Sequence, residues 1–336
     1  MKRLAIAVAV ASVLVSAPAA AQTLKAVKER GSLVCGVGQM LYGFSASDDK
    51  GNYSGFDVDL CRAIAAAIFN DPSKVKYVPL SAPERFAPLQ SGAIDVLSRN
   101  TTWTMSRETS LGLNFAAVTY YDGQGFLVRT ALNVESALEL GDKSVCVQTG
   151  TTSELNVAEY FSNNRMKHKL VTLPTAEEAL KAYDSGRCDA LTSDVSQLYA
   201  ERLKLPKVGD HIILPDIISK EPLGPVVRQG DDQWFNFVKW AHFAMVNAEE
   251  LGVSSATLDE ALRSEKPAVK RLIGTDGDYG EQIGLTKDWA ARIIRHVGNY
   301  DEVFERNVGT GSKLGIPRGI NNLWSNGGIL YAPPIR

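Results

Sequence analysis

Two residues far apart in the sequence are suited to bind groups of opposite charge. Arg107 follows a threonine-rich stretch, and its guanidinium fork could hold a carboxylate through two parallel hydrogen bonds. Asp194 follows an expected strand, and its carboxylate could accept hydrogen bonds from an ammonium group. Each has a plainer interpretation, since an arginine is usually a solvated surface residue and an aspartate there could cap a helix expected at residues 195–203. Taken singly, the plainer interpretations are favoured.

A third candidate for ligand binding is the segment at residues 147–153. It reads as the end of a strand, a turn at Gly150 and the start of a helix. Free backbone N–H groups at a helix N-terminus attract anions. Simple capping of the helix by Thr152 or Ser153 explains the same residue types, and the two interpretations are compatible.

Strands and helices alternate in the same order twice along the chain. The first series has strands at residues 33–37, 76–80 and 94–98 and helices at 57–69 and 83–90. The second has strands at residues 143–147, 169–173 and 188–192 and helices at 152–161 and 176–183. The amino-acid sequence repeats as well: SGAIDVLS at residues 91–98 is similar to SGRCDALT at residues 185–192. We therefore predict an α/β fold with two doubly wound lobes and a ligand cleft between them.

The cleft should be lined by residues that follow the third strand of each lobe, because ligands bind beyond the carboxyl ends of such strands. They are Arg99, Asn100, Thr101 and Thr102 in the first lobe and Ser193 and Asp194 in the second. We predict that Arg99 points into the cleft and favours polar or acidic ligand side chains, while binding stays broad. The alternative is that Arg99 bridges the lobes or pairs with a carboxylate at the cleft rim.

Two crossings between the lobes set the expected domain boundaries. Residues 120–129 look like the first crossing, with a hinge in the flexible Asp-Gly-Gln-Gly at 122–125, and residues 214–228 look like the return. Lobe 2 is predicted at residues 123–221, inserted into lobe 1 at residues 22–122 and 222–336. A helix at residues 232–251 rejoins lobe 1. The tail from residue 274 is rich in Gly, Asn and Pro and should carry a helix at 286–297.

Residues 1–21 have the order of a secretory signal peptide. Met1, Lys2 and Arg3 form a positive start, residues 4–15 are almost wholly apolar, and residues 19–21 are small. The apolar run is too short to span a bilayer, which needs about 20 residues. A lipoprotein signal has a Cys directly after the cleavage point, whereas the residue after the expected cleavage at Ala21 is Gln22. We therefore expect a soluble protein in the periplasm; a buried N-terminal helix is the alternative.

The composition is typical of a globular protein of two domains. A chain of 336 residues suggests two domains of about 150 residues each, and its 45% hydrophobic content is ordinary. Lys and Arg number 36 against 38 Asp and Glu, a net charge of −2, which lacks the basic excess of a nucleic-acid binder. With four histidines and no closely spaced cysteine pair, we predict neither a metal nor another cofactor.

The four cysteines are expected to form one disulfide in each lobe, since an even number in an oxidising compartment favours disulfides. Cys35 and Cys146 lie at matching points on the first strand of each lobe. The first and third strands are neighbours in a doubly wound sheet, which places Cys188 beside Cys146. Cys61 opens the helix that should pack on Cys35. We predict Cys35–Cys61 and Cys146–Cys188; the alternative is four buried thiols.

Several motifs resemble the amino-acid-binding proteins of ABC importers, which are bacterial extracellular solute-binding proteins of family 3. The shared pieces are GFDVDL at residues 55–60 and the segments 99–107, 148–153 and 189–194. The closing run at residues 315–334 resembles the general L-amino-acid-binding subgroup in particular. The resemblance covers essentially the whole chain after residue 21. It implies a type II periplasmic binding protein fold and a monomer that delivers L-amino acids to a membrane permease.

The resemblance also implies a role for four residues. Arg107 would clamp the ligand α-carboxylate, and Asp194 would hold the α-ammonium. Thr102 would donate its backbone N–H to the ligand and contact the ammonium through its hydroxyl. Thr152 would add a backbone N–H to the carboxylate.

Two departures from the family pattern bear on the ligand side chain. Many members stack an aromatic ring on it where this chain has Leu41, so an aromatic wall must come from Tyr42 or Phe44. The residue that matches Arg99 is usually small in binders of polar and basic amino acids. The preferred side chain is therefore left open.

An enzyme and a sensor module are the alternatives to a ligand-capture protein. Some proteins on this fold are dehydratases, which need a general acid in the cleft. Glu154 is the candidate acid, but it falls more naturally on a helix surface. A sensor module is usually fused to a membrane span, and no stretch after the signal peptide approaches one. We therefore predict that the protein is not an enzyme.

Overall fold

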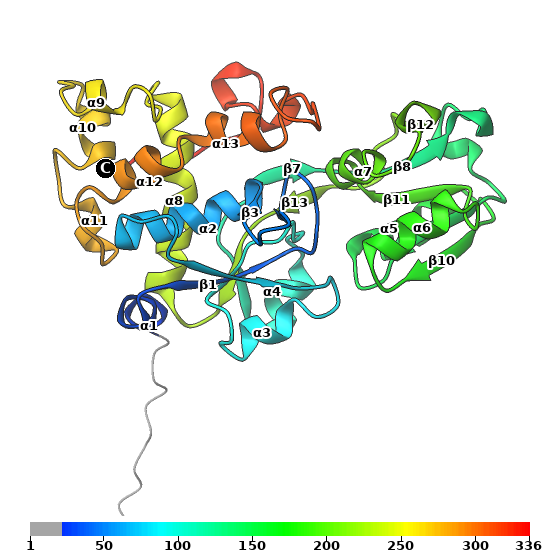
Figure 1. The fold of residues 1–336 in the computed structure, drawn as a ribbon, viewed down its shortest axis with the longest axis horizontal. Helices are drawn as coiled ribbons and strands as arrows, with labels where there is room; N and C mark the ends of the chain where they lie inside the picture. The colour runs from blue at the N-terminus through cyan, green and yellow to red at the C-terminus, as the bar shows by residue number, and fades with distance from the viewer. Residues whose placement is uncertain (1–21) are drawn as a thin grey trace, which may run out of the picture.

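The computed structural model describes residues 22–336, so the predicted signal peptide lies outside the described residues. Two α/β lobes lie side by side, and extended segments join them (Figure 1). The lobe 1 sheet has the order β4 (Val75–Pro79), β1 (Leu33–Val37), β5 (Val96–Leu97), β14 (Val226–Arg228) and β6 (Leu113–Phe115). The lobe 2 sheet has the order β10 (Lys169–Leu173), β9 (Ser144–Gln148), β11 (Ala190–Asp194), β8 (Gln124–Arg129) and β12 (His211–Ile213).

The two sheets have the same topology, as the internal repeat predicts. In each, the first three strands in this order are parallel, and the fourth is antiparallel to both of its neighbours. The fourth strands, β14 and β8, belong to the segments that cross between the lobes. The α/β class with two doubly wound lobes is therefore correct, and each parallel sheet gains an antiparallel strand from a crossing.

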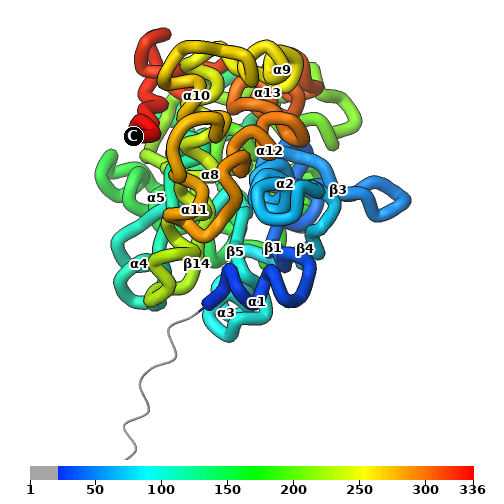
Figure 2. The backbone as a smooth tube through the Cα atoms, turned by 90° about the vertical axis from the view of Figure 1, so that its left-hand side faces the viewer, coloured from blue at the N-terminus to red at the C-terminus, as the bar shows by residue number. Residues whose placement is uncertain are grey.

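Helices cover both sheets. Those of lobe 1 are α1 (Thr23–Arg30), α2 (Phe56–Phe69), α3 (Phe86–Gln90), α4 (Met105–Leu111), α8 (Asp232–Glu250), α9 (Leu258–Ala261), α10 (Pro267–Ile273), α11 (Tyr279–Gln282), α12 (Trp289–His296) and α13 (Tyr300–Asn307). Those of lobe 2 are α5 (Thr152–Asn163), α6 (Ala176–Asp184) and α7 (Val195–Arg202). Lobe 1 also has a short pair of strands, β2 (Ala46–Ser47) and β3 (Tyr53–Ser54). In lobe 1, α12 packs against α2 and α8 (Figure 2).

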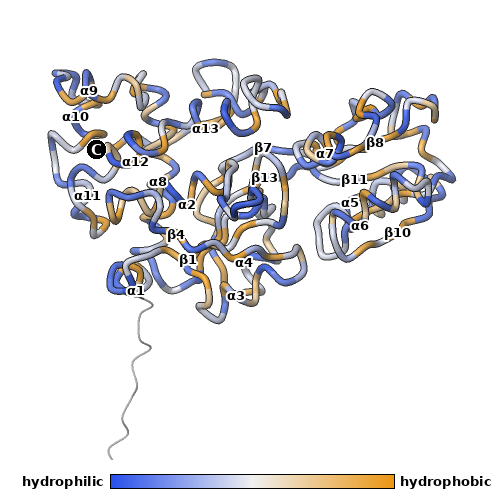
Figure 3. Tube along the Cα trace, viewed as in Figure 1, coloured by the Kyte–Doolittle hydropathy of each residue, from blue (hydrophilic) through white to orange (hydrophobic). Residues whose placement is uncertain are grey.

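The lobe 2 sheet is buried on both faces, which explains its continuous apolar strands. Along β8, Phe126 and Val128 belong to one hydrophobic cluster, while Leu127 between them belongs to another. Successive side chains of a strand point to opposite faces, so a strand covered on both sides is apolar throughout. Figure 3 shows this hydrophobic stretch at β8.

The lobes are connected by a two-stranded antiparallel pair, β7 (Tyr120–Asp122) and β13 (Glu221–Leu223). Between β7 and β8, Gly123 lies where a Cβ atom would come within 2.3 Å of Ile217 and 3.0 Å of the Ser219 carbonyl oxygen. This glycine therefore permits close packing of the crossing strands, in addition to any hinge role.

Several predicted boundaries were wrong by a few residues. Strand β11 ends at Asp194, two residues later than predicted, because Ser193 and Asp194 pair with Gly125 and Gln124 of β8. Strand β5 is shorter than predicted. The tail is also more helical than predicted. In particular, α13 begins with a capping box in which Asn299 and Glu302 cap each other's backbone N–H groups.

Both predicted disulfides are present. Cys35 on β1 is bonded to Cys61 on α2, with a Cα–Cα distance of 6.2 Å. Cys146 on β9 is bonded to Cys188, just before β11, with a Cα–Cα distance of 5.6 Å. No cysteine is left as a free thiol among residues 22–336.

Within the part of the chain that the structure describes, no helix combines the length and the apolar character that a bilayer crossing requires.

Candidate functional site

A small polar pocket lies between the lobes, at the carboxyl ends of β5, β9 and β11. We call it the inner pocket, and it is lined by Arg85, Arg99, Asn100, Thr102, Gln148, Thr151, Thr152, Ser153, Ser193, Asp194 and Gln197. Its volume is about 20 Å³, which is room for about one water molecule. A ligand of amino-acid size can therefore enter only if the lobes first move apart.

Three guanidinium groups converge on this region. Arg85 is buried, and its Nε atom has no hydrogen-bond partner among the described residues. Arg99 is also buried, and its Nε donates to the Leu80 carbonyl at 3.0 Å. Arg107 donates from Nη1 to the Thr102 carbonyl at 2.8 Å, and it lies beside the inner pocket rather than in its lining. The three side chains thus form a concentrated site for negative groups.

Burial lowers the pKa of each of these arginines. Burial alone is the largest cause for Arg85, Arg99 and Arg107, and the pKa of Arg99 falls to about 10. Repulsion by Arg107 lowers the pKa values of Arg85 and Arg99 further. The negative charge of Asp194 acts in the opposite direction and raises the pKa of all three arginines. The positive charges are therefore only partly compensated, and an anion in the pocket would relieve their repulsion.

Asp194 is the carboxylate that opposes these arginines. Only 6% of the residue is exposed, and its side chain forms no hydrogen bond within residues 22–336. It occupies the N-cap position of α7 without capping the helix, so the plainer interpretation of this residue is not realised. Burial raises its pKa well above the usual value, and repulsion by Asp122 and Glu221 adds to this. A cationic ligand group would supply the missing partner.

Thr102 of lobe 1 and Thr152 of lobe 2 meet at one carboxylate. Their hydroxyl oxygens lie 3.3 Å apart, and they donate to Oε2 of Glu221 at 2.6 and 2.8 Å respectively. Helix α5 is capped by the Thr151 side chain, which accepts from the Glu154 N–H at 3.3 Å. The cap therefore falls to Thr151, and Thr152 is left to face the pocket.

A hydrogen bond to Asp57 of the GFDVDL motif holds the loop after β5 in place. Asp57 accepts the Asn100 N–H at 2.9 Å. Burial raises the pKa of Asp57 to about 7, and the nearby Arg99 opposes this shift. The Asn100 side chain points across the cleft and donates to Gln197 of lobe 2 at 3.4 Å. The predicted cleft position of Asn100 is thus observed.

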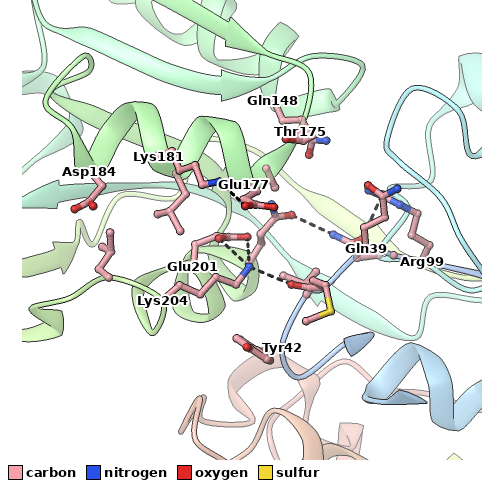
Figure 4. Close-up of a pocket in the computed structure, with 18 residues that line it drawn as sticks. Gln39, Tyr42, Arg99, Gln148, Thr175, Glu177, Lys181, Asp184, Glu201 and Lys204 are labelled. Atoms are coloured by element: carbon pink, nitrogen blue, oxygen red, sulfur yellow. Dashed lines mark hydrogen bonds and ion pairs between the residues drawn. The ribbon is translucent and has the colours of Figure 1, made fainter. Parts of the chain in front are cut away.

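A larger space, which we call the outer chamber, shares part of its lining with the inner pocket. Figure 4 shows the residues that line the outer chamber. Its volume is about 450 Å³. Four residues line both spaces, and they are Arg99, Asn100, Gln148 and Gln197. Its charged wall comes mainly from lobe 2, where Lys204 pairs with the buried Glu201 at 3.1 Å. Lys204 also donates to the Met40 carbonyl of lobe 1 at 3.0 Å, so it bridges the lobes.

The structure separates the two aromatic residues that were considered for the ligand wall. Tyr42 lines the outer chamber, and Lys204 lies 5.5 Å from the centre of its ring. Phe44 is 1% exposed and packs against Phe56 and Tyr120 in the lobe 1 core. The structure therefore does not bring Phe44 to the cleft, because the short loop after β1 turns its ring inward.

Two residues of the site escaped the sequence reasoning. Arg85 follows β4, so the rule that ligands bind beyond strand ends would have found it if the second strand of the lobe had been included. Glu221 lies at the start of β13, and no local pattern marks it, because its partners are up to 119 residues away in sequence. Glu154, the candidate catalytic acid, accepts hydrogen bonds from Thr149 and Gly150 at the start of α5, outside the pocket lining.

Comparisons with known proteins agree on one family. Residues 33–255 match the bacterial extracellular solute-binding proteins, family 3. The general L-amino acid-binding periplasmic protein AapJ of Rhizobium johnstonii is 57% identical over 338 residues, which cover all of this chain and 99% of the relative. The glutamate/glutamine/aspartate/asparagine-binding protein BztA of Rhodobacter capsulatus is 51% identical over 96% of each chain.

A solved structure is similar over almost the whole described chain. It is a periplasmic binding protein of an ABC transporter from Brucella ovis with glutathione bound, and its sequence is 55% identical. The two structures superpose with a TM-score of 0.92 over 94% of this chain and 99% of the other. The similarity therefore includes both lobes and the C-terminal tail.

Proposed function

This chain belongs to the bacterial extracellular solute-binding proteins of family 3, and we propose that it captures L-amino acids in the periplasm for the membrane permease of an ABC importer. Its fold is that of the type II periplasmic binding proteins. The names of AapJ and BztA support the ligand class and the compartment. The relatives are solute-binding proteins of transporters, not enzymes, which confirms the prediction that this protein is not an enzyme. We propose that it acts as a monomer.

One observation carries the choice of ligand: a buried carboxylate that has no hydrogen-bond partner within residues 22–336 faces three buried or partly buried guanidinium groups. Asp194 supplies the carboxylate, and Arg85, Arg99 and Arg107 supply the positive groups. An α-amino acid carries one ammonium and at least one carboxylate, so it satisfies both sides at once. Charge-assisted hydrogen bonds of this kind are roughly twice as strong as neutral ones.

We propose that Arg107 holds the α-carboxylate through the nitrogens that its bond to Thr102 leaves available. The backbone N–H groups of Thr102 and of Thr152, at the start of α5, complete the carboxylate site. Asp194 and the Thr102 hydroxyl hold the α-ammonium. The ligand then stabilises the closed arrangement of the lobes, because it binds residues of both.

We propose that the lobes comprise residues 22–122 with 222–336 and residues 123–221. The antiparallel pair of β7 and β13 supports these boundaries, since each boundary falls at or beside one of its strands. Closure would bend the chain at the ends of this pair.

The arginines also favour a polar or acidic ligand side chain. Arg99 donates to the Leu80 carbonyl, while Arg85 Nε has no partner in the described part of the chain, so Arg85 is the freer of the two to bind a side-chain carboxylate or amide. Arg99→Ala and Arg85→Ala are titrated calorimetrically with glutamate, glutamine, alanine and leucine. We expect each to weaken glutamate binding more than alanine binding. If glutamate loses no more affinity than alanine in either variant, these arginines do not select the side chain.

A second candidate ligand class is favoured by the outer chamber. The chamber has a volume of about 450 Å³ and shares part of its lining with the inner pocket. Its walls carry positive side chains, negative side chains and the aromatic ring of Tyr42. A γ-linked peptide such as glutathione, which the Brucella relative holds, has an α-amino acid at one end and a long polar extension. We propose that this chain can place such an extension in the outer chamber. Thermal unfolding with reduced glutathione tests this, and Lys204→Ala and Tyr42→Ala should weaken glutathione more than glutamate.

A further inference from the structure

Glu221 is a buried carboxylate at the junction of the two lobes, and it accepts four hydrogen bonds. Its Oε2 atom accepts from the hydroxyls of Thr102 at 2.6 Å and Thr152 at 2.8 Å. Its Oε1 atom accepts from the Asn156 amide at 2.7 Å and the Ser219 hydroxyl at 2.6 Å. Only 1% of the residue is exposed. A carboxylate offers about four acceptor sites, so these donors satisfy it completely without a ligand.

This arrangement fixes the direction of both threonine protons. A hydroxyl has one proton to donate and two lone pairs that can accept. Because Thr102 and Thr152 each direct their proton to Glu221, they present only lone pairs to the pocket. The carboxylate of Asp194, which has no hydrogen-bond partner among the described residues, lines the same pocket. The pocket therefore offers acceptors from three side chains.

We propose that Glu221 is a positioning residue that makes the pocket wall formed by the two threonine hydroxyls selective for the ligand ammonium, a proposal that rests on the amino-acid binding proposed above. It does not touch the ligand but acts through the two threonine hydroxyls. Because both hydroxyl protons point to Glu221, the threonine oxygens can only accept hydrogen bonds from a ligand. A ligand carbonyl oxygen beside them binds poorly, since it too can only accept. The threonine oxygens favour an ammonium, which carries three N–H donors.

The same carboxylate joins the parts that form the site. Thr102 comes from the lobe 1 loop after β5, whereas Thr152 and Asn156 come from α5 of lobe 2. Glu221 itself begins β13, one of the two strands that connect the lobes. Both hydroxyls therefore reach Oε2 only in the arrangement of lobes described here, so the ammonium site is complete only when the lobes are brought together.

The test replaces Glu221 by glutamine, which keeps the shape but turns one acceptor atom into a donor. With its nitrogen at the Oε1 position, the new amide would face the Asn156 amide donor, so we expect the nitrogen at the Oε2 position. There it donates to the threonine oxygens, and at least one threonine can direct its proton into the pocket. Wild-type and Glu221→Gln proteins are titrated calorimetrically with L-glutamate. They are also titrated with 2-oxoglutarate, which has a carbonyl in place of the ammonium. We expect glutamate affinity to fall at least tenfold while 2-oxoglutarate affinity stays unchanged or rises.

Ser219→Ala is the matched control, because it removes a donor from Oε1 and leaves the bonds of Oε2 in place. We expect its glutamate affinity to stay within about threefold of wild type, a smaller change than the roughly tenfold to 150-fold range of a lost hydrogen bond to a charged group. Equal losses for both ligands in Glu221→Gln, or a loss in Ser219→Ala as large as in Glu221→Gln, would overturn the proposal.

Two further readouts keep the outcome unambiguous. If circular dichroism shows that Glu221→Gln does not fold, Thr152→Val takes its place, since it removes one acceptor and keeps the carboxylate. It should weaken glutamate but not 2-oxoglutarate, and equal weakening would again overturn the proposal. If wild-type protein binds no L-amino acid, the proposed function itself fails. Binding by wild type with an unchanged preference in the variant refutes only the role of Glu221.

Discussion

Replacement of Asp194 by asparagine should abolish tight amino-acid binding and, at the same time, stabilise the ligand-free protein. The residue is 6% exposed and its side chain forms no hydrogen bond within the described chain, so we expect its charge to bind the ligand. Removal of one partner of a buried charge pair costs about 2–5 kcal/mol. At 1.4 kcal/mol per tenfold, affinity should fall roughly 30-fold to 4,000-fold.

The stability change has the opposite sign because the charge is unfavourable before ligand binds. Burial and repulsion by Asp122 and Glu221 raise the pKa of Asp194 in the folded protein. A carboxyl group whose pKa is raised on folding contributes stability below its unfolded pKa and loses it as the pH rises through the folded pKa. At pH 8, asparagine removes this penalty, so the melting temperature of the ligand-free variant should exceed that of wild type.

The assay combines calorimetric titration with thermal unfolding at pH 8. Asp189→Asn is a matched control, because Asp189 accepts two hydrogen bonds from Ser144 away from the pocket, at 2.8 Å from the N–H and 2.7 Å from the hydroxyl. The control should lower the melting temperature and leave affinity unchanged. The reasoning is refuted if Asp194→Asn binds amino acids with near-normal affinity, or if it unfolds at a lower temperature than wild type without ligand.

Three further predictions follow from the same site and from the disulfides. Arg107→Ala should lower amino-acid affinity by about 2–5 kcal/mol, more than tenfold, and near-normal binding in calorimetry would contradict the assignment. Amino-acid affinity should fall as the pH is lowered from 8 to 5, because the raised pKa of Asp194 lets this carboxyl take up a proton that the ligand must displace. Calorimetric titrations in buffers of different ionisation enthalpy should detect the released proton. An affinity that does not change with pH would contradict this role of Asp194. Reduction of Cys35–Cys61 and Cys146–Cys188, which lie 26 and 42 residues apart, should remove about 3–4 kcal/mol each from the free energy of unfolding, and an unchanged urea midpoint under reductant would contradict this.

The sequence predicted features that depend on order along the chain. The repeated alternation of strands and helices led to two lobes of equal topology, and the parallel pairing of first and third strands placed Cys188 beside Cys146. Compartment and topology together were enough to identify both disulfides. The loops after β5 and β11 also line the pocket between the lobes, as predicted from the rule that ligands bind beyond strand ends in such sheets.

Features that depend on contacts between the two crossings were missed. The true end of β11 is set by its pairing with β8, a strand from the first crossing that periodicity alone did not place in the sheet. Glu221 was missed for the same reason, since it belongs to the return crossing and three of its four hydrogen-bond donors, Thr102, Thr152 and Asn156, lie on other segments. Phe44 was misplaced because the direction of a side chain in a short loop is decided by core packing, in this case against Phe56 and Tyr120.

The most direct test of amino-acid capture is the thermal unfolding of protein freed of bound ligand, screened against the twenty L-amino acids beside Arg107→Ala. A ligand that binds only the folded protein raises its stability by about 2.7 kcal/mol at a hundred times its Kd. We predict concentration-dependent increases in the melting temperature of wild type, largest for polar and acidic amino acids, and no increase in the variant. If no L-amino acid at millimolar concentration shifts the melting temperature of wild type, or if Arg107→Ala shifts as much, the account is contradicted.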